Sequence, residues 1–571
     1  MNYNLKKRDY PLCPTVHYEN FRDMVLTCGE RYGERPAFSY RVTPHDPESL
    51  TLSFRQVAED VSAYATALIA RGFRGKKVAL VGENSYTWIY SYLALASIGA
   101  IAVPVDKEYP AADMASILNT ARCDCLVASA ALGDKLDYLR ENVPSLGAVV
   151  LFSGEGETPT VADLIAEGQA AIAAGDTSYT DYEIDPDALL FIVFTSGTTG
   201  KGKGVMLTTR NILTDLEHGI ALFDLPEKTF FVLPAHHTFA STANLLGHYG
   251  QGIEIYISHG PRYIVNEIKA ENPTHLMLVP LYVETFYKKI FAAIEKQGKL
   301  GLVRKMMKLS NGLRKLGIDL REKLFGKVLS TFGTRMRLII CGGAALSQEI
   351  IDDLDALGIT ILNGYGITEC SPLISCNRNN YRKAGSVGRP IAANLLKIDK
   401  PNEAGEGEIC IKGSNVMLGY FEDEEATAAV FDEEGYFHTG DLGRLDEEGW
   451  IYITGRLKNL IILSNGKNVY PEELETAVAG IYGVSEVVVY AGECRSDASK
   501  ELIVAEIFPD DEAMKLRGIS DCGKYFHDEI AKLNGANAPH KKIGHVKIRT
   551  EEFPKTTTRK ITRFAIDKHI D

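Results

Sequence analysis

The sequence has little of what several classes of protein require. Its ten cysteines are scattered singly, apart from Cys123 and Cys125, so no ladder of CxxC pairs indicates a zinc site. The longest apolar run, 92–105, contains a glycine and a proline and is shorter than the roughly 20 residues that span a bilayer. The first residues lack the apolar stretch of a signal peptide. We therefore expect a soluble protein of the reducing cytoplasm.

The chain also lacks an excess of positive charge. Its 62 Lys and Arg residues stand against 75 Asp and Glu residues, which gives a net charge of −13 and disfavours nucleic acid as a partner. Any anion must be bound in a local pocket. A hydrophobic content of 45% excludes a disordered or collagen-like chain, and 571 residues are too many for one core.

Helices and strands are expected to alternate early in the chain. Residues 62–70 and 88–97 have helical patterns, while 77–81 and 101–105 are short apolar strands, an alternation typical of α/β layers. Short strands follow Gly405, and a new α+β pattern begins after Gly455. We predict a large, multi-layered N-terminal α/β domain with parallel-rich sheets, 1–456, joined by a hinge to a smaller α+β C-terminal domain, 457–571.

Residues 295–337 carry twelve Lys and Arg residues against three acidic ones. Apolar residues recur at helical spacing within them, at Leu302, Val303, Met306, Met307 and Leu313. One interpretation is a surface for a membrane or another anionic ligand, with at most peripheral membrane contact. The other is a solvated helix face whose opposite side packs on the core, and this second interpretation is favoured because charge runs are usually surface.

The most informative segment follows the apolar strand 188–194 and reads TSGTTGKGKG. Its glycines let successive backbone N–H groups turn inward around phosphate oxygens, and its hydroxyl and lysine side chains add donors and charge. The phosphate-binding candidates are Thr195, Ser196, Gly197, Thr198, Thr199, Gly200 and Lys201.

This loop is not a Walker loop, although 197–203 fits G-x-x-x-x-G-K. Gly204 stands where that motif needs Ser or Thr, and Val205 begins a second strand where a helix should open. Thr208 and Thr209 are the expected cap of a later helix at 211–222. A flexible Gly/Thr hairpin without a ligand is the simpler alternative.

Four further motifs follow in order: Asn363-Gly-Tyr-Gly-Ile-Thr-Glu369, Tyr436-Phe-His-Thr-Gly-Asp441, Gly455-Arg-Leu-Lys458 and Phe553-Pro-Lys-Thr-Thr-Thr-Arg-Lys-Ile-Thr-Arg563. Together with the loop they resemble the signatures of the AMP-forming, acyl-adenylating superfamily, over residues 20–570. The resemblance implies ATP and Mg²⁺ as cofactors and a two-step activation of an organic acid.

The resemblance also implies roles for single residues. Glu369 would hold Mg²⁺ with Thr195 nearby, Asp441 would bind the ribose, and Arg456 would bridge ribose and phosphate. Tyr365 would offer a face to adenine. The residues expected to line the nucleotide are Gly343, Ala344, Ala345, Asn363, Gly364, Tyr365, Gly366 and Thr368.

The small domain is implied to move between the two steps. Lys560 would reach the carboxylate and the α-phosphate during adenylation, Lys458 would be the hinge, and a thiol tunnel would pass near Gly466. The family usually has a glycine before its lysine, where this chain has Arg559. Pro554 and Lys560 keep the family's spacing, so the resemblance still implies this role for Lys560.

Adjacent His236 and His237 are not expected to share a metal ion, because neighbouring residues on an extended chain point to opposite faces. The resemblance places His237 at the gate of the acyl site, and a core histidine is the equal alternative. The acyl pocket is expected to be apolar and to use residues such as Phe239, Ala240, Leu245, Leu246, Ile367 and Pro372.

This lining, the Cys341-Gly-Gly-Ala-Ala-Leu segment and the basic stretch before it resemble long-chain fatty acyl-CoA synthetases. We therefore expect a fatty acid substrate and coenzyme A as the acceptor. The alternatives are a ligase that loads an acyl carrier protein and a nucleotide-binding protein without turnover; a Walker-type ATPase is disfavoured by Gly204. The sequence leaves the chain length, the oligomeric state and the pathway open.

Overall fold

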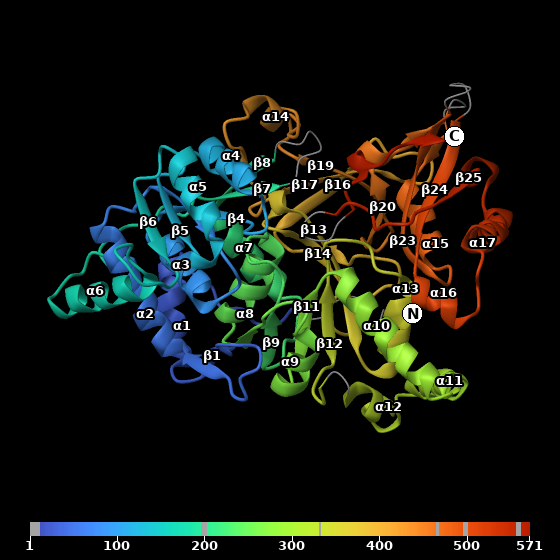
Figure 1. The fold of residues 1–571 in the computed structure, drawn as a ribbon, viewed down its shortest axis with the longest axis horizontal. Helices are drawn as coiled ribbons and strands as arrows, with labels where there is room; N and C mark the ends of the chain where they lie inside the picture. The colour runs from blue at the N-terminus through green and yellow to red at the C-terminus, as the bar shows by residue number, and fades with distance from the viewer. Residues whose placement is uncertain are drawn as a thin grey trace. The chain divides into compact units, whose positions relative to one another are not determined.

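The computed structural model describes residues 12–195, 202–330, 333–463, 467–494, 501–555 and 561–570. The chain divides into two compact units, of which the first comprises Met1–Leu395 and Ile411–Phe437, and the second Leu396–Cys410 and His438–Asp571 (Figure 1). The predicted boundary at 456/457 lies inside the second unit. One reason is that β20 (Ile451–Arg456) contacts α15 (Pro471–Ala479), so that the chain before and after this boundary packs together.

Three sheets build the first unit. The largest has the strand order β18-β8-β7-β4-β3-β5-β6, the next β11-β12-β13-β14-β15, and the smallest β2-β1-β10-β9. Their strands are β1 Pro36–Tyr40, β2 Leu50–Ser53, β3 Lys77–Val81, β4 Ile101–Val105, β5 Cys125–Ala128, β6 Ala148–Leu151, β7 Leu189–Thr195, β8 Lys203–Thr208, β9 Lys228–Phe231, β10 Glu254–Ile257, β11 His275–Leu278, β12 Leu338–Cys341, β13 Thr360–Gly366, β14 Leu373–Cys376, β15 Arg389–Pro390 and β18 Gly419–Tyr420.

Helices cover these sheets. They are α1 Phe21–Tyr32, α2 Phe54–Ala70, α3 Tyr86–Ser97, α4 Ala111–Ala121, α5 Asp134–Asn142, α6 Val161–Ala173, α7 Thr209–Ile220, α8 Gly247–Gly250, α9 Ile264–Glu271, α10 Pro280–Lys296, α11 Leu300–Arg314, α12 Arg321–Leu329, α13 Gln348–Leu357 and α14 Glu424–Ala428. Short 3-10 turns η1 Ala130–Leu132 and η4 Thr368–Cys370 and a π-helix, η2 Phe239–Leu246, complete the unit.

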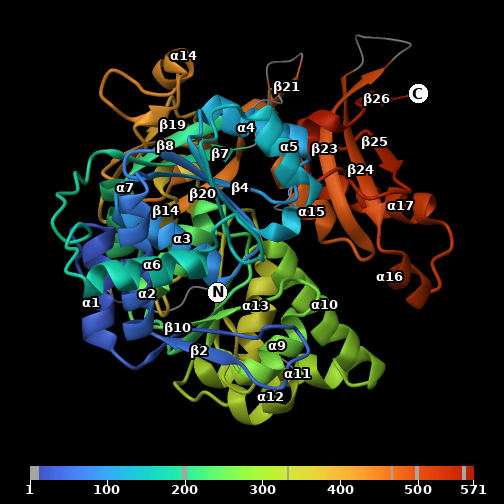
Figure 2. The ribbon, with the colours of Figure 1, turned by 60° about the vertical axis from the view of Figure 1, so that its left-hand side comes forward.

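The largest sheet is parallel from β7 through β4, β3 and β5 to β6, as the early alternation of helix and strand predicts. Figures 1 and 2 show α4 and α5 on one side of it and α2 and α3 on the other. Met114 and Leu118 of α4 and Leu139 of α5 are fully buried in the core that they form with Val81 and Val103. The predicted strands 77–81 and 101–105 are confirmed.

The basic segment 295–337 forms part of α10, then α11 and α12, which lie together in both views (Figures 1 and 2). Its arginines pair with the acidic helix α13: Arg304 contacts Asp353, and Arg314 contacts Asp355 at 2.8 Å. Because Asp355 is 1% exposed, these pairs anchor the segment to the fold. The arginines therefore support the interpretation as a packed helix face.

One leucine of the predicted helical pattern on α11 is not buried. Val303 and Met307 are buried, but Leu302 is 57% exposed, and Leu309 of the same helix is 62% exposed. The helical repeat explains this, because Leu302 and Leu309 are seven residues apart and share a face that Val303 does not. The apolar face of α11 is thus split between core and surface.

The second unit is an α+β structure. Its sheets have the orders β16-β17-β19-β20, β21-β22 and β25-β24-β23-β26. The strands are β16 Asn394–Asp399, β17 Gly407–Gly413, β19 Phe437–Leu445, β20 Ile451–Arg456, β21 Ile461–Ile462, β22 Asn468–Val469, β23 Val484–Cys494, β24 Glu501–Pro509, β25 His545–Ile548 and β26 His569–Ile570. The helices are α15 Pro471–Ala479, α16 Asp511–Leu516 and α17 Cys522–Ala536, with 3-10 turns η5 Leu457–Asn459, η6 Pro539–Lys541 and η7 Arg563–Ala565.

Helices α15 and α17 pack on the four-stranded sheet around β23 and β24. Leu474 and Val478 of α15, Phe526 and Ile530 of α17, and Val489 form its buried core. The predicted helix at 471–479 occupies those residues, and the expected α+β pattern is confirmed. In the described part of the chain, every helix falls short of the length and apolarity needed to cross a bilayer.

Candidate active site

The glycine-rich loop connects two antiparallel strands, as predicted. Thr195 ends β7 and pairs with Lys203, which begins β8, and the Thr195 hydroxyl lies 3.5 Å from the Lys203 carbonyl oxygen. Helix α7 starts only after β8, where Thr208 and Asn211 form a capping box. A Walker loop would open directly into a helix, so this geometry excludes that motif. The predicted Ser196, Gly197, Thr198, Thr199, Gly200 and Lys201 lie outside the described residues.

Glu369 is held beside the base of this hairpin. It lies in η4, its backbone oxygen accepts a hydrogen bond from the Met417 N–H at 2.8 Å, and its Oε1 accepts one from the Tyr420 hydroxyl at 3.0 Å. Tyr420 belongs to β18, which pairs with β8. The Lys203 ammonium lies 4.5 Å from the centroid of the Tyr420 ring. A continuous set of contacts therefore joins the hairpin base to the predicted metal ligand.

Tyr420 was not predicted from the sequence. Burial, and then the neighbouring Glu369 carboxylate, raise the pKa of its phenol well above the usual range. The phenol therefore stays protonated and can only donate to Glu369. Tyrosine at the end of an apolar segment carries no signal for this role, because the contact depends on pairing between strands more than 200 residues apart in sequence.

A buried aspartate fixes the backbone next to Glu369. Asp215 of α7 accepts hydrogen bonds from the Leu373 N–H at 2.8 Å and from the Asn415 amide at 3.1 Å. The same amide donates to the carbonyl oxygens of Cys370 and Leu373 at 2.9 and 2.8 Å. Burial raises the pKa of Asp215 well above its usual range. Neither Asp215 nor Asn415 was predicted from the sequence. Both side chains hold the backbone around Glu369 in place.

The second nucleotide motif lies at the carboxyl end of β13. Its neighbour β12 is parallel to it, with Cys341 opposite Asn363, so the predicted segment Gly343-Ala344-Ala345 leaves the sheet beside Asn363-Gly364-Tyr365-Gly366 and Thr368. Ligands of α/β sheets bind at such carboxyl edges. The structure therefore brings these predicted residues to one edge.

The side chain of Asn363 adds a specific indication. Its backbone oxygen accepts hydrogen bonds from the Asn377 backbone and side chain, at 3.0 and 3.1 Å. Its buried side-chain oxygen, in contrast, has no hydrogen-bond partner among the described residues. Buried acceptors are normally paired, so this atom is suited to a donor on a bound molecule, such as the amino group of adenine.

The two histidines occupy different environments. His236 Nε2 lies 3.4 Å from Asp106, and burial lowers the pKa of His236 to about 3. His237 lies just before the π-helix η2, whose N-cap is Thr238, and its carbonyl oxygen accepts hydrogen bonds from the Ala240 and Ser241 N–H groups at 2.9 Å each. π-Helical turns often accompany functional sites. The role of His237 as a gate stays a prediction.

Some of the residues expected to line the acyl pocket are instead buried in the hydrophobic core. Ala240, Leu245 and Leu246 are fully buried, whereas Phe239 is only partly buried. A side chain built at Gly342 would approach the Phe239 ring to 3.5 Å, so η2 lies against the end of β12. Of these four residues, Phe239 is the one that lies next to the end of β12, where the predicted Gly343-Ala344-Ala345 segment leaves the sheet.

Asp441 and Arg456 form an ion pair in the second unit. They face each other across β19 and β20, and Arg456 Nε lies 2.9 Å from Asp441 Oδ1. The Asp441 side chain is 5% exposed and that of Arg456 is 46% exposed. The predicted ribose ligand and its neighbour are therefore brought together, with the guanidinium open to solvent.

Lys458 lies in η5, directly after β20, and its role as hinge stays a prediction. Gly466 and Lys560 lie outside the described residues. The residues on either side of 556–560 form an antiparallel bridge, Lys555 with Ile561, and the Thr562 N–H donates to the Pro554 oxygen at 2.7 Å.

Comparison with known proteins agrees with this arrangement. A family model described as AMP-binding enzyme matches residues 27–421. The chain therefore belongs to the AMP-binding enzyme family. Among curated proteins it is 28% identical to long-chain-fatty-acid–CoA ligase 5 of Rattus norvegicus, over 84% of this chain and 74% of that protein. It is 27% identical to long-chain-fatty-acid–CoA ligase FadD15 of Mycobacterium bovis, over 76% of this chain and 74% of that protein.

Solved structures with this fold include ATP-bound MatB from Rhodopseudomonas palustris, with a TM-score of 0.74, 22% identity and coverage of 95% of this chain and 98% of that chain. O-succinylbenzoate coenzyme A synthetase from Bacillus subtilis, in complex with ATP and a magnesium ion, has a TM-score of 0.71, 21% identity and coverage of 95% and 98%. At such identity these structures establish the fold, a mixed α/β architecture with parallel-rich sheets.

Proposed function

We propose that this protein activates a long-chain fatty acid with ATP and transfers the acyl group to coenzyme A. Membership of the AMP-binding family and similarity to long-chain-fatty-acid–CoA ligases over three quarters or more of the chain support this proposal. The observation that carries it is the position of Glu369, which Tyr420 holds beside the base of the β7–β8 hairpin.

The reaction has two balanced steps. A carboxylate oxygen attacks the α-phosphorus of ATP, a new C–O–P linkage forms, and the bond to the bridging oxygen breaks to release pyrophosphate. The thiol sulfur then attacks the carbonyl carbon, forming the thioester, while AMP leaves with the anhydride oxygen and the thiol proton passes to solvent. Carboxylate and triphosphate repel each other, so fixed local charges must lower the first barrier.

The residues present fit the groups that this chemistry requires. The Glu369 carboxylate and the Thr195 hydroxyl are oxygen donors of the kind that suits Mg²⁺, which when bound would neutralise phosphate charge. The buried side-chain oxygen of Asn363 is suited to the adenine amino group. Asp441 presents a carboxylate for the ribose hydroxyls, and Arg456 presents an exposed guanidinium for phosphate.

Product analysis tests the activity. We expect AMP and pyrophosphate only when a fatty acid is present, and thioester only when coenzyme A is added. ADP formed without an acid would reject the proposal. Release of pyrophosphate should be greatest with acids of about ten or more carbons, because each buried CH₂ contributes about 0.8 kcal/mol. A preference for acetate or aromatic acids would reject the fatty acid specificity, and thioester formed on an acyl carrier protein alone would reject coenzyme A as acceptor.

A lysine variant separates the two steps. We expect Lys560→Ala to abolish acid-dependent pyrophosphate exchange, because the ammonium would no longer steady the charge that develops on the phosphate. Preformed acyl-adenylate should still be converted to thioester by coenzyme A. Equal loss of both steps would contradict this role, and Lys555→Ala, which removes a neighbouring lysine paired with Glu552 at 2.7 Å, is the control.

A further inference from the structure

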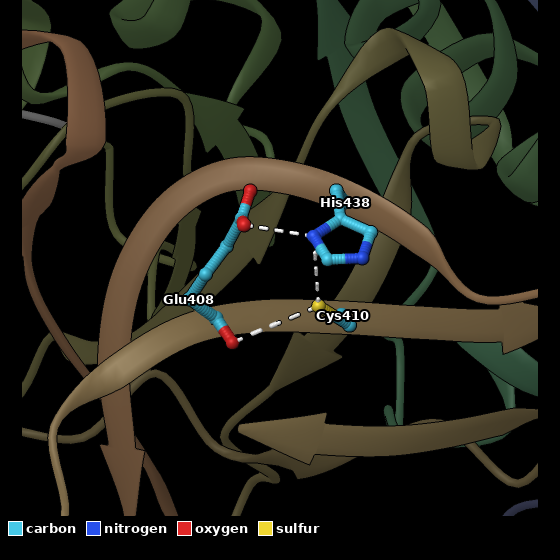
Figure 3. A group of neighbouring side chains, drawn as sticks. All are labelled: Glu408, Cys410 and His438. Atoms are coloured by element: carbon cyan, nitrogen blue, oxygen red, sulfur yellow. Dashed lines mark hydrogen bonds and ion pairs between the residues drawn. The ribbon is translucent and has the colours of Figure 1, made fainter. Parts of the chain in front are cut away.

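Three potential metal ligands meet on one sheet of the second unit. Glu408 and Cys410 are two residues apart on β17, and His438 is on the adjacent strand β19 (Figure 3). Residues two apart on a strand share a face, so both side chains of β17 point to the same side as the imidazole. His438 Nδ1 lies 2.8 Å from Glu408 Oε2 and 3.5 Å from Cys410 Sγ.

These separations match those around a single tetrahedral ion. With zinc–sulfur and zinc–nitrogen distances of about 2.3 and 2.0 Å, two ligands at the tetrahedral angle lie about 3.5 Å apart, which is the observed separation of sulfur and nitrogen. Nitrogen and oxygen ligands would lie about 3.3 Å apart, which is about 0.5 Å more than the observed separation of His438 Nδ1 and Glu408 Oε2. One donor atom from each residue lies within 4.8 Å of the other two.

Ordinary hydrogen bonding does not use all these contacts at once. In a given tautomer, Nδ1 either donates to the Glu408 carboxylate or accepts from the Cys410 thiol. The thiol also lies 3.8 Å from the Glu408 backbone oxygen, a long contact. A cation, in contrast, would be bound by the thiolate, the imidazole and the carboxylate together. Thiolate and imidazole are the donors that favour zinc and chemically related ions over magnesium or calcium.

The surroundings hold two of the ligands in place. Glu408 Oε1 accepts a hydrogen bond from the Gly440 N–H at 2.9 Å, which directs Oε2 toward His438. The Thr439 hydroxyl donates to the Ile409 oxygen at 2.8 Å and ties the two strands together between the ligands. Such outer contacts orient metal ligands. The side chains of Glu408 and His438 are 16% and 24% exposed, so an ion can reach them from solvent.

We propose that Glu408, Cys410 and His438 form a binding site for a thiophilic divalent cation of the zinc type, with water as the remaining ligand. The site is distinct from the magnesium-binding role predicted for Glu369 and Thr195. The sequence did not reveal this site, because it has no ladder of CxxC pairs. His438 follows Cys410 by 28 residues and approaches it only because β17 and β19 are neighbouring strands.

Cobalt(II) tests the site, since its thiolate complexes absorb in the near ultraviolet and its d–d bands report tetrahedral geometry. We expect the wild-type chain to bind one equivalent with a thiolate band. Cys410→Ala should lose this band and bind at least 100-fold more weakly, while Cys522→Ser, a variant of a partly buried cysteine in the same unit, should keep it. An unchanged band in Cys410→Ala, or a wild-type chain without one, would overturn the proposal.

A second pair of measurements covers the case in which Cys410→Ala does not fold. Glu408→Gln keeps the shape and the acceptor for Gly440 but removes the charge, and we expect its cobalt affinity to fall about tenfold. Zinc should raise the unfolding midpoint of the wild-type chain more than that of this variant, because a ligand stabilises the state that binds it. Equal affinities and equal midpoint shifts would contradict the proposed site.

Discussion

Glu369 depends on a neighbour, Tyr420, that was not among the predicted site residues. The Tyr420 hydroxyl donates to its carboxylate at 3.0 Å and is kept protonated by its raised pKa. The tyrosine therefore orients the Glu369 carboxylate. At the level of single residues, the carboxylate proposed to bind the metal and the hydroxyl that orients it come from two side chains that the sequence separates by 51 positions.

Substituting each residue should separate these contributions. We expect Glu369→Gln to slow pyrophosphate exchange by about 10²–10³-fold and to raise the magnesium concentration needed for half-maximal rate, because the anionic oxygen is lost. Tyr420→Phe should slow exchange by only about tenfold, as expected for one hydrogen bond to a charged group, with little change in magnesium dependence. Wild-type exchange in Glu369→Gln would exclude it as a metal ligand.

The motif residues and their supports differed in how well they could be predicted. Asp441 and Arg456 could be assigned from motif order alone, and the structure places them 2.9 Å apart. Asp215, Asn415 and Tyr420 could not, because each acts through a hydrogen bond to a segment more than 40 residues away. A local pattern reports residue type and spacing but not contacts between distant strands.

The connection from β13 through η4 to β14 is the element that positions Glu369. Gly366 ends β13 at a close approach, where a Cβ atom would lie 2.1 Å from the Pro372 oxygen. That same oxygen accepts a hydrogen bond from the Ile367 N–H at 2.8 Å. Backbone crowding on both sides means that a side chain at residue 366 must displace the connection itself.

Two glycine variants give a matched test of this connection. We expect Gly366→Ala to destabilise the protein by about 1–3 kcal/mol and to reduce exchange activity, because the backbone must shift. Gly312→Ala, on α11 with open space around the new methyl group, should stabilise the protein by about 0.5–1 kcal/mol and leave activity unchanged. Urea unfolding and exchange assays measure both, and a neutral Gly366→Ala would contradict the argument.

Helix α11 presents an apolar and basic face to solvent. Leu302, Lys305 and Leu309 lie at helical positions i, i+3 and i+7 and are all exposed, and Lys308 and Lys315 flank them. The sequence predicted the helix but not which leucines face outward, because the arginine pairs with α13 that set its rotation join separate segments of the chain. This face combines the charge and apolar area that an anionic bilayer binds.

Vesicle binding tests this face. We expect the protein to sediment with vesicles that contain anionic lipid, more weakly as salt increases, and Leu302→Ala with Leu309→Ala to lower the partition at least tenfold, since burying each leucine contributes about 1.5–3 kcal/mol. Val42→Ala, a site 70% exposed elsewhere in the first unit, is the control. Equal binding by the double variant and the control would exclude α11 as the contact.

At the scale of the whole molecule, buried histidines link stability to pH. His248 and His275 face each other in the first unit, with Nε2 atoms 2.7 Å apart, and burial lowers the pKa of His248 to about 4 and that of His275 well below its usual value. Unfolding returns each to about 6.5, so the unfolded chain binds more protons and stability falls as pH decreases below about 6.5. Acids whose pKa burial raises, such as Asp215 and Glu475, act in the opposite direction.

These contributions partly offset one another in the wild-type protein. The change of unfolding free energy with pH is therefore best compared between the wild type and a variant that lacks one buried histidine. Between pH 7.5 and 6.0 the wild-type chain should lose about 0.8 kcal/mol more unfolding free energy than His248→Gln, which lacks one proton-binding group in the unfolded state. The lower pH stays above the pI of about 5.6, where low net charge promotes association. Urea titrations of the wild type and His248→Gln at both pH values measure these slopes. Parallel slopes for His248→Gln and the wild type would show that His248 takes up protons equally in the folded and unfolded chains, and would exclude a pKa lowered by burial.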